Sequence, residues 1–226
     1  MELTVITLNV RGLRKRSKRL SVFTYLQDKK ADIVFLQETF CTKDNIKKFN
    51  ADWEGLAFHS VSSSKHSKGV CILLRKELNI NIINTIKDSD GRGIIMNADI
   101  DNNMHSLVSV YCPNDDSKRA KHISLLSEWI TEHAKNADNL IIGGDFNCNS
   151  DDNITKPLSA KCLQKVLTYL NACDTWKLKN PTESCITYID PSGRGYSSRI
   201  DLIIASNAIS RNIQSCNVIP SPGPDH

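Results

Sequence analysis

The stretch Asn139-Leu-Ile-Ile-Gly-Gly-Asp-Phe-Asn147 is a short apolar run that ends in two glycines and then carries a carboxylate and a carboxamide. Residues two positions apart in an extended segment point the same way. Asp145 and Asn147 are therefore predicted to converge on one small target at a strand end, with Phe146 turned into the core. The two glycines would let the backbone approach a ligand closely. The alternative is a simple turn, because Gly, Asp and Asn all favour turns.

The composition is that of an ordinary globular protein. The 226 residues, 40% apolar and 24% charged, suit one large domain or two small ones. No apolar run reaches the roughly 18 residues that a membrane span needs, so no membrane partner is expected. The first eight residues lack a basic leader and are not expected to be a signal peptide. The eight cysteines form no Cys-x-x-Cys pair, so we expect reduced thiols and a cytoplasmic or nuclear location.

Positive charge is concentrated near the N-terminus. The net charge is only +4, but six of the nine residues from Arg11 to Arg19 are basic, and Lys65 and Lys68 add to them. Such a cluster suits a polyanion, typically a nucleic-acid backbone. The alternative is a solvated surface without a ligand.

The apolar pattern predicts one domain over residues 1–226, with many strands and few helices, and therefore packed sheets with helices outside. Helices are predicted after Ser17, after Ser117 and around residues 163–170. Strands are predicted at 3–8, 31–36, 70–74, 80–86, 93–100, 106–111, 139–142, 185–189, 199–205 and 212–219.

Polar residues recur where these apolar runs end, and strand ends at one edge of two packed sheets can form one site. The oxygen ligands among them suit Mg²⁺, and the whole set suits hydrolysis of a phosphate ester. Simpler interpretations stay open: Tyr111 and Thr187 are good strand residues, and Asp201 could pair with Arg199. The other histidines (59, 66, 105, 122 and 133) are expected at the surface. The residues of the predicted site are Asn9, Glu38, Tyr111, Asp145, Asn147, Thr187, Asp201, Asp225 and His226.

Eight short motifs occur in one order along the whole chain, and together they resemble the exonuclease–endonuclease–phosphatase superfamily. Within it, the chain is most similar to the endonuclease domain of non-LTR (LINE-type) retrotransposons, which are related to apurinic/apyrimidinic endonucleases. The motifs are Leu8-Asn-Val-Arg-Gly-Leu13, Phe35-Leu-Gln-Glu-Thr39, Lys68-Gly-Val-Cys-Ile-Leu73, Val110-Tyr-Cys-Pro-Asn114, Ile142-Gly-Gly-Asp-Phe-Asn147, Thr187-Tyr188, Ser198-Arg-Ile-Asp201 and Asp225-His226.

The resemblance implies an α/β fold, a four-layered sandwich with two packed mixed β-sheets flanked by helices. It also implies a role for each matched position. Glu38 and Asn9 would hold Mg²⁺, with Mn²⁺ able to substitute. The catalytic roles implied are activation of water for Asp145, alignment for Asn147, phosphate binding for His226 with Asp225 and for Tyr111, and the leaving-group side for Thr187 and Asp201.

Two features depart from the family pattern. Pro224 stands where a small hydroxyl residue usually precedes the final Asp-His pair. The family also continues past that histidine with another strand, whereas this chain stops at His226. We therefore expect a domain excised from a larger polyprotein with a downstream reverse transcriptase, monomeric as an isolated domain.

The resemblance to the retrotransposon branch predicts a magnesium-dependent endonuclease that nicks one strand of double-stranded DNA and leaves a 3′-hydroxyl to prime reverse transcription. A turn-rich segment between Thr187 and Asp201 suits a protruding hairpin, and Arg194 within it is a candidate minor-groove probe. Alternatives are an abasic-site repair endonuclease or a nucleic-acid-binding module with weak catalysis. The predicted DNA contacts are Arg14, Arg16, Lys68, Arg194 and Arg199.

Overall fold

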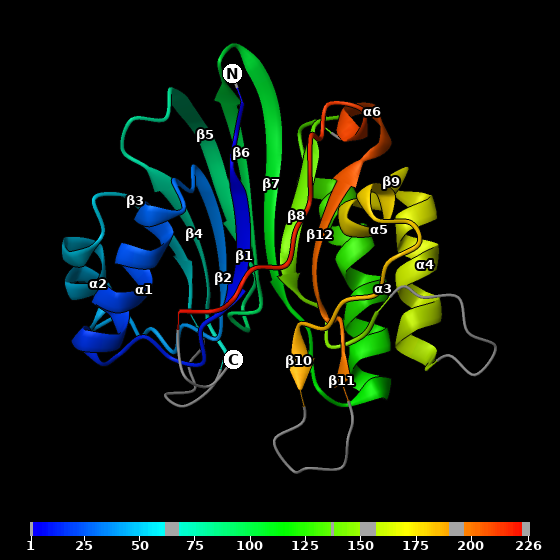
Figure 1. Cartoon of the computed structure of the whole chain (residues 1–226), viewed down its shortest axis with the longest axis horizontal. Coiled ribbons are helices and arrows are strands. Elements are labelled where there is room, and N and C mark those ends of the chain that lie inside the picture. Colours follow the sequence, from blue (N-terminus) through cyan, green and yellow to red (C-terminus); the bar gives the residue numbers. More distant parts are fainter. Residues whose placement is uncertain (1, 62–67, 137, 150–156, 190–196, 223–226) are drawn as a thin grey trace.

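Two β-sheets lie face to face at the centre of the computed structural model, which describes residues 2–61, 68–136, 138–149, 157–189 and 197–222 (Figure 1). The first sheet has the strand order β1-β2-β4-β3, and β1 pairs with β2 in parallel while the other pairs are antiparallel. Its strands are β1 (Val5–Asn9), β2 (Ile33–Gln37), β3 (Gly55–Ser60) and β4 (Val70–Arg75).

The second sheet has the order β5-β6-β7-β8-β12-β9, in which only β7 and β8 are paired in parallel. Both sheets are therefore mixed. The strands are β5 (Ile80–Lys87), β6 (Gly93–Ile100), β7 (Asn103–Tyr111), β8 (Leu140–Asp145), β9 (Ala172–Asp174) and β12 (Asp201–Ser206). A short hairpin, β10 (Tyr188–Ile189) with β11 (Ser197–Ser198), pairs separately.

Helices cover the outer faces of both sheets, α1 and α2 on the first and α3 and α4 on the second (Figure 1). Phe23 and Leu26 of α1 and Phe49 of α2 are buried against the first sheet. Ile123 of α3 and Leu163 of α4 are buried against the second. The predicted four-layered α/β sandwich is confirmed. The helices are α1 (Arg16–Asp28), α2 (Ile46–Asp52), α3 (Asp116–His133), α4 (Leu158–Tyr169), α5 (Thr175–Lys179) and α6 (Asn207–Ser210).

A third apolar cluster fills the space between the sheets, with side chains such as Phe35 from β2 and Met96 from β6. The sheets pack tightly at Gly143, where an added Cβ would lie 2.1 Å from Phe35 Cδ2. At Gly144 a Cβ would lie 2.2 Å from the Val110 carbonyl oxygen. These glycines therefore allow close packing between strands and between sheets. The prediction that they let a ligand approach the backbone was wrong.

Several local predictions were wrong. Residues 212–219 form no strand, and the strand predicted at 185–189 is reduced to β10. The N-cap of α1 is Lys15, without a side-chain hydrogen bond, and the cap of α3 is Asp115, whose carboxylate accepts from the Lys118 N–H. His59 is buried, only 4% exposed, because its Nε2 bonds Asn50 Oδ1 at 2.8 Å and its ring packs on Phe49.

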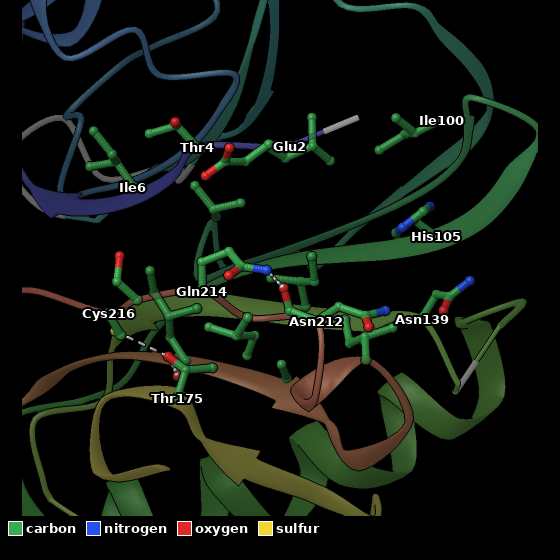
Figure 2. A pocket seen from close by; sticks show the side chains of 18 of the residues that line it. Glu2, Thr4, Ile6, Ile100, His105, Asn139, Thr175, Asn212, Gln214 and Cys216 are labelled. Atoms are coloured by element: carbon green, nitrogen blue, oxygen red, sulfur yellow. Dashed lines mark hydrogen bonds between the residues drawn. The ribbon is translucent and has the colours of Figure 1, made fainter. Parts of the chain in front are cut away.

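A groove of about 880 Å³ runs between β1 and the segment that follows α6 (Figure 2). Thr4 and Asn139, which line it, stand at the starts of the β1 and β8 runs. A second cavity of about 540 Å³ lies farther along β1 and reaches Asn9, Arg11 and Asp201. Only this second cavity borders the strand ends where the predicted site lies. In the part of the chain that the structure describes, no helix has the length and apolarity of a membrane span.

Candidate active site

The candidate active-site side chains stand where strands of both sheets end. β1 ends at Asn9 and Glu38 directly follows β2; the two strands are parallel, with Asn9 in register with the residue before Glu38. In the second sheet, Tyr111 lies opposite Asp145 on the parallel strands β7 and β8. Asp201 also lies opposite Asp145, because the antiparallel strand β12 begins at that edge.

Asn9 joins the groups from the two sheets. Its Nδ2 donates to Glu38 Oε1 at 2.9 Å and to Asp145 Oδ2 at 2.9 Å. Its Oδ1 accepts a hydrogen bond from the Arg11 N–H at 3.1 Å. A single carboxamide therefore holds one carboxylate of each sheet next to the other, as the positions of these residues at strand ends predict.

Asn147 is fixed on two sides. Its N–H donates to Asp145 Oδ1 at 2.9 Å, and its Nδ2 donates to the Cys112 carbonyl at 2.8 Å. Both Asn147 and Glu38 have a φ of 52°, in the left-handed region. That conformation costs a non-glycine residue on the order of 1–3 kcal/mol and persists where the surroundings impose it, commonly at functional sites.

Thr187 holds the start of β12. Its Oγ1 accepts hydrogen bonds from the Ile200 N–H at 3.0 Å and the Asp201 N–H at 3.1 Å. Asp201 Oδ1 is shielded from solvent and has no hydrogen-bond partner among the described residues. A buried carboxylate oxygen without a partner is costly, so Asp201 is a candidate for a role toward a bound group.

Asp145 and Asp201 interact electrostatically. Burial is the main cause that raises the pKa of each carboxyl, and the Asp145 charge raises the pKa of Asp201 further. Hydrogen bonds from Asn9 and Asn147 act the other way on Asp145, and a hydrogen bond with Thr187 does so on Asp201. Two neighbouring carboxyls in different surroundings can have different protonation states. One can then act as a general base while the other keeps its proton and acts as a general acid.

Tyr111 is a buried phenol beside Glu38. Burial, the Glu38 charge and a hydrogen bond with Glu38 all raise the pKa of Tyr111. Arg92 donates through Nη1 to the Tyr111 carbonyl at 3.2 Å, and its guanidinium lies 5.1 Å from the ring centroid. The phenol thus keeps its proton at neutral pH and can donate a hydrogen bond to an oxygen in the site.

Arg11 belongs to the site although the sequence indicated only that it was part of a basic loop. Its guanidinium lies 6.0 Å from the Tyr188 ring centroid, and its charge lowers the pKa of both Asp145 and Asp201. Its backbone has a φ of 43°. The signal available in the sequence was its place two residues after Asn9, within the first motif.

The predicted DNA contacts differ in their surroundings. Arg14, in the basic loop, and Arg16, the first residue of α1, are exposed. Arg14 Nε donates to the Phe40 carbonyl, and Arg16 Nε pairs with Asp52 at 3.0 Å. Lys68 Nζ lies 3.7 Å from Asp90 Oδ2. All three stay predictions.

The prediction for Arg199 was wrong. Its side chain is 4% exposed, and Nη1 and Nη2 bind the two carboxylate oxygens of Asp174 at 3.1 and 2.6 Å. The guanidinium also lies 5.1 Å from the Trp176 ring centroid. Because all its contacts are internal, Arg199 is not available to a DNA phosphate, and its partner is not Asp201. The predicted roles of Arg194, Asp225 and His226 lie outside the described residues.

The residues that converge here fit a divalent cation. The described residues contain no group of three His, Cys, Asp or Glu side chains arranged to hold a metal. Mg²⁺, however, keeps several waters and needs only one or two protein carboxylates with oxygen neighbours. Glu38 and Asp145 supply hard oxygens within reach of Asn9, and Asn9 Oδ1 has a second lone pair besides the one that accepts from Arg11.

Comparison with known proteins gives a consistent family. The model of the Endonuclease/Exonuclease/phosphatase family matches residues 6–222. A Xenopus laevis protein, the uncharacterized 149 kDa protein of transposon TX1, is 28% identical over 232 residues, which cover 100% of this chain but 18% of that protein. The chain thus spans less than a fifth of this curated relative.

Solved structures share the fold. The AP endonuclease LMAP from Leishmania major superposes with a TM-score of 0.73 at 17% identity, over 99% of this chain and 85% of that one. The endonuclease domain of TRAS1, a telomere-specific non-LTR retrotransposon, gives a TM-score of 0.66 at 17% identity, over 92% and 87%. At these identities the likeness concerns the fold alone.

Proposed function

Because the chain belongs to the Endonuclease/Exonuclease/phosphatase family, we propose that it is a magnesium-dependent endonuclease that nicks one strand of double-stranded DNA. Membership of the family makes it a hydrolase of the nuclease and phosphodiesterase type. The observation that carries the proposal is the Asn9 carboxamide, which holds Glu38 and Asp145 of the two sheets at 2.9 Å each.

The expected product is a 3′-hydroxyl that primes reverse transcription at the target. The 28% identity to a transposon protein along the whole chain supports this choice within the family. The chain covers only 18% of that protein, which supports a single endonuclease domain within a larger polyprotein that also carries a reverse transcriptase. As an isolated domain it would be monomeric, and its DNA target would place its action in the nucleus.

The residues would divide the work as follows. Mg²⁺ held by Glu38 and Asn9 would offset the negative charge of the scissile phosphate. Asp145, ionised and oriented by Asn9 and Asn147, would take a proton from the attacking water. Tyr111, whose raised pKa keeps it protonated, would donate to a phosphate oxygen.

Of the remaining catalytic candidates, Thr187 and Asp201 would act on the leaving-group side and the others on the phosphate. Asp201, held at the start of β12 by Thr187, has a pKa raised by burial and by Asp145, so it would retain a proton more readily than an exposed carboxyl. Asp225 and His226 would complete the phosphate site, as the family resemblance implies. Arg11 adds a positive charge beside these carboxylates and would attract a phosphate oxygen.

DNA would lie across the edge that carries these strand ends. The exposed cations Arg14, in the basic loop, and Arg16, at the start of α1, would contact backbone phosphates on one side. Lys68 would join them, since the Phe40 N–H donates to the Lys68 carbonyl and the Phe40 carbonyl accepts from Arg14 Nε. The β10–β11 hairpin stands at the same edge (Figure 1). Arg194, which lies outside the described residues, stays a candidate groove probe on the sequence alone.

Supercoiled-plasmid nicking tests the proposal. Wild-type protein is expected to relax the plasmid with Mg²⁺ or Mn²⁺ and not with EDTA, and Asp145→Ala should abolish relaxation. Asp138→Asn is the matched control, because Asp138 is an exposed acid before the opposite end of β8. Extension of the nick by a DNA polymerase would show a free 3′-hydroxyl. Nicks that no polymerase extends would exclude a role in priming.

Repair of abasic sites is the second candidate, because the fold is shared with AP endonucleases. Duplexes with and without one abasic site separate the two: faster cleavage at the abasic site would favour repair. Binding that weakens steeply with salt, without metal-dependent nicking in any substrate, would favour a binding module.

A further inference from the structure

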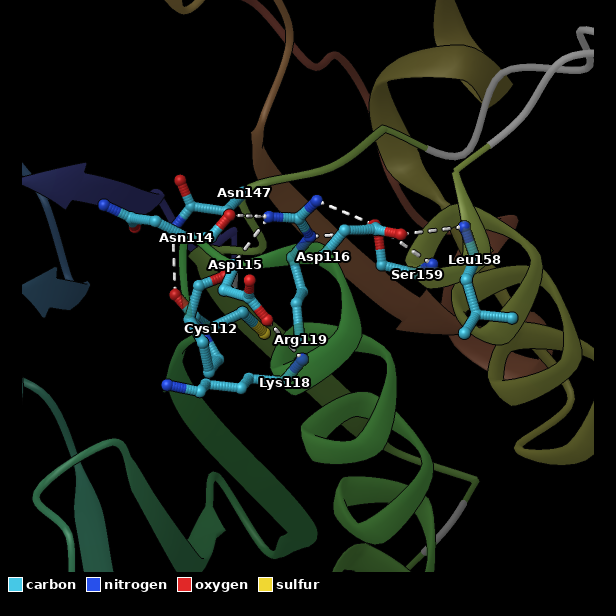
Figure 3. Close-up of polar contacts among 10 residues, drawn as sticks. Cys112, Asn114, Asp115, Asp116, Lys118, Arg119, Asn147, Leu158 and Ser159 are labelled. Carbon is cyan, nitrogen blue, oxygen red and sulfur yellow. Dashed lines mark hydrogen bonds and ion pairs between the residues drawn. The ribbon is translucent and has the colours of Figure 1, made fainter.

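Arg119 is a buried arginine of α3, 7% exposed. Among the described residues, it contacts none of the acidic side chains of the candidate site. Its guanidinium reaches two other segments of the chain (Figure 3). Nε donates to Ser159 Oγ at 2.9 Å on α4, and Nη1 donates to the carbonyls of Pro113 at 3.3 Å and Asn114 at 2.5 Å. Nη2 donates to Asp116 Oδ1 at 2.9 Å within α3.

Asp116 extends these contacts to the start of α4. The N-cap of α4 is Pro157, which offers no side-chain acceptor. Asp116 replaces it from the neighbouring helix, because its carboxylate accepts from the Leu158 N–H at 3.1 Å and the Ser159 N–H at 3.3 Å. It also accepts from the Ser159 hydroxyl. Asp116, Arg119 and Ser159 thus tie the first turns of α3 and α4 to the loop after β7.

That loop, residues 112–114, is also the support of the catalytic asparagine. The Cys112 carbonyl accepts from Asn147 Nδ2 at 2.8 Å, and the Cys112 N–H donates to the Asp145 carbonyl at 2.8 Å. Of three consecutive loop carbonyls, the first therefore holds Asn147 and the next two are held by Arg119 (Figure 3).

Stability alone is a poor explanation for this arrangement. The Asp116 side chain is 41% exposed, so its ion pair with Arg119, at 2.9 Å, is screened by solvent, and such a pair contributes little to stability. A guanidinium, however, offers several donors in a rigid fork, which can fix acceptors on several segments at once. Lysine has a single nitrogen and cannot reproduce that geometry.

We propose that Arg119 is a positioning residue for catalysis: it fixes the 112–114 loop so that the Cys112 carbonyl orients the Asn147 carboxamide. Asn147 depends on such a support because its backbone is in the left-handed region, with a φ of 52°. The inference rests on the proposed function, since it assigns Asn147 to the reaction. Misplacement of a catalytic group by about 1 Å can lower a rate on the order of 100-fold.

The test compares Arg119→Met with Ser159→Ala. Both remove contacts between α3 and α4, but only Arg119→Met releases the Pro113 and Asn114 carbonyls. We expect Arg119→Met to lower the kcat of nicking by roughly 10- to 100-fold with little change in KM. Ser159→Ala should lower the unfolding temperature and leave kcat unchanged. Arg119→Lys, which keeps the charge but not the fork, should lie between wild type and Arg119→Met.

A second measurement does not depend on activity. The side-chain NH₂ signals of Asn147 in the ¹⁵N spectrum, assigned with Asn147→Asp, should shift in Arg119→Met and not in Ser159→Ala. Unchanged signals and kcat in Arg119→Met, with a loss of thermal stability like that of Ser159→Ala, would overturn the proposal. If wild-type protein nicks no DNA, the proposed function fails, and the NMR comparison still decides whether Arg119 positions Asn147. If Arg119→Met does not fold, Arg119→Lys carries both measurements.

Discussion

Replacing Arg199 with methionine should destabilise the protein strongly and leave its DNA affinity unchanged. Arg199 and Asp174 are each 4% exposed and bind one another through two hydrogen bonds, at 3.1 and 2.6 Å. Methionine would remove both Arg199 hydrogen bonds from the buried Asp174 carboxylate. Breaking a buried pair in this way costs about 3–5 kcal/mol. At about 2–4 °C per kcal/mol for a chain of this size, the unfolding temperature should fall by roughly 6–20 °C.

Urea unfolding, followed by tryptophan fluorescence and circular dichroism, gives the free energy directly. The double variant Arg199→Met with Asp174→Asn is the control, because asparagine keeps an oxygen that can cap α5 at the Trp176 N–H but carries no charge. The double variant should recover part of the lost stability. Duplex binding at several salt concentrations should keep the wild-type slope of log K against log salt, since Arg199 contacts no phosphate.

Two results together would refute this reasoning. A free energy of unfolding within about 1 kcal/mol of wild type would show that the pair is not buried as described. A salt slope reduced by about 0.9, the value for one lost phosphate contact, would restore Arg199 to the DNA contacts that the sequence predicted.

Other predictions follow from single side chains. Arg14→Ala should lower the salt slope of duplex binding by about 0.9 at unchanged unfolding temperature, because Arg14 is exposed; an unchanged slope in filter binding would contradict the proposed contact. Burial, with a smaller effect of Lys87, lowers the pKa of His59 to about 4. The buried neutral imidazole contributes stability above the ordinary histidine pKa of about 6.5, so the free energy of unfolding should fall by up to roughly 3 kcal/mol as pH falls toward 4. In His59→Gln the urea midpoint should depend less on pH over this range. Gly143→Ala would place a Cβ 2.1 Å from Phe35 Cδ2 and should cost about 1–3 kcal/mol by overpacking, part of which Phe35→Leu should restore in thermal unfolding.

The fold was predictable from the sequence because its central strands are continuous apolar runs. β2 is buried at all five positions and β4 at five of six, and such runs leave little alternative to a strand covered on both faces. The segment 212–219 failed for the opposite reason. Its apolar residues Ile213, Val218 and Ile219 suggest a strand, but no strand of the described ranges pairs with them. Val218 and Ile219 are 45% and 40% exposed.

The candidate site was predictable in part, because strand ends at one edge of a sheet are fixed by topology. Asn9, Glu38, Asp145 and Asn147 therefore came together as expected. What no local pattern could show is which group mediates the contact between sheets. That depends on β1 facing β8 across the core, and on the Asn9 carboxamide reaching residues 29 and 136 positions away.

The arginines show where sequence reasoning about charge fails. Arg19, Arg119 and Arg199 are all buried, and each is paired with one aspartate. An internal ion pair takes one positive and one negative charge away from the surface. The net charge of +4 therefore does not show whether a given arginine is exposed or buried. Arg19 also donates to the Leu13 and Arg14 carbonyls at 2.9 and 3.2 Å, and so shapes the loop that presents Arg14. Part of the basic cluster therefore builds the surface, and only its exposed members would set how the proposed DNA binding depends on salt.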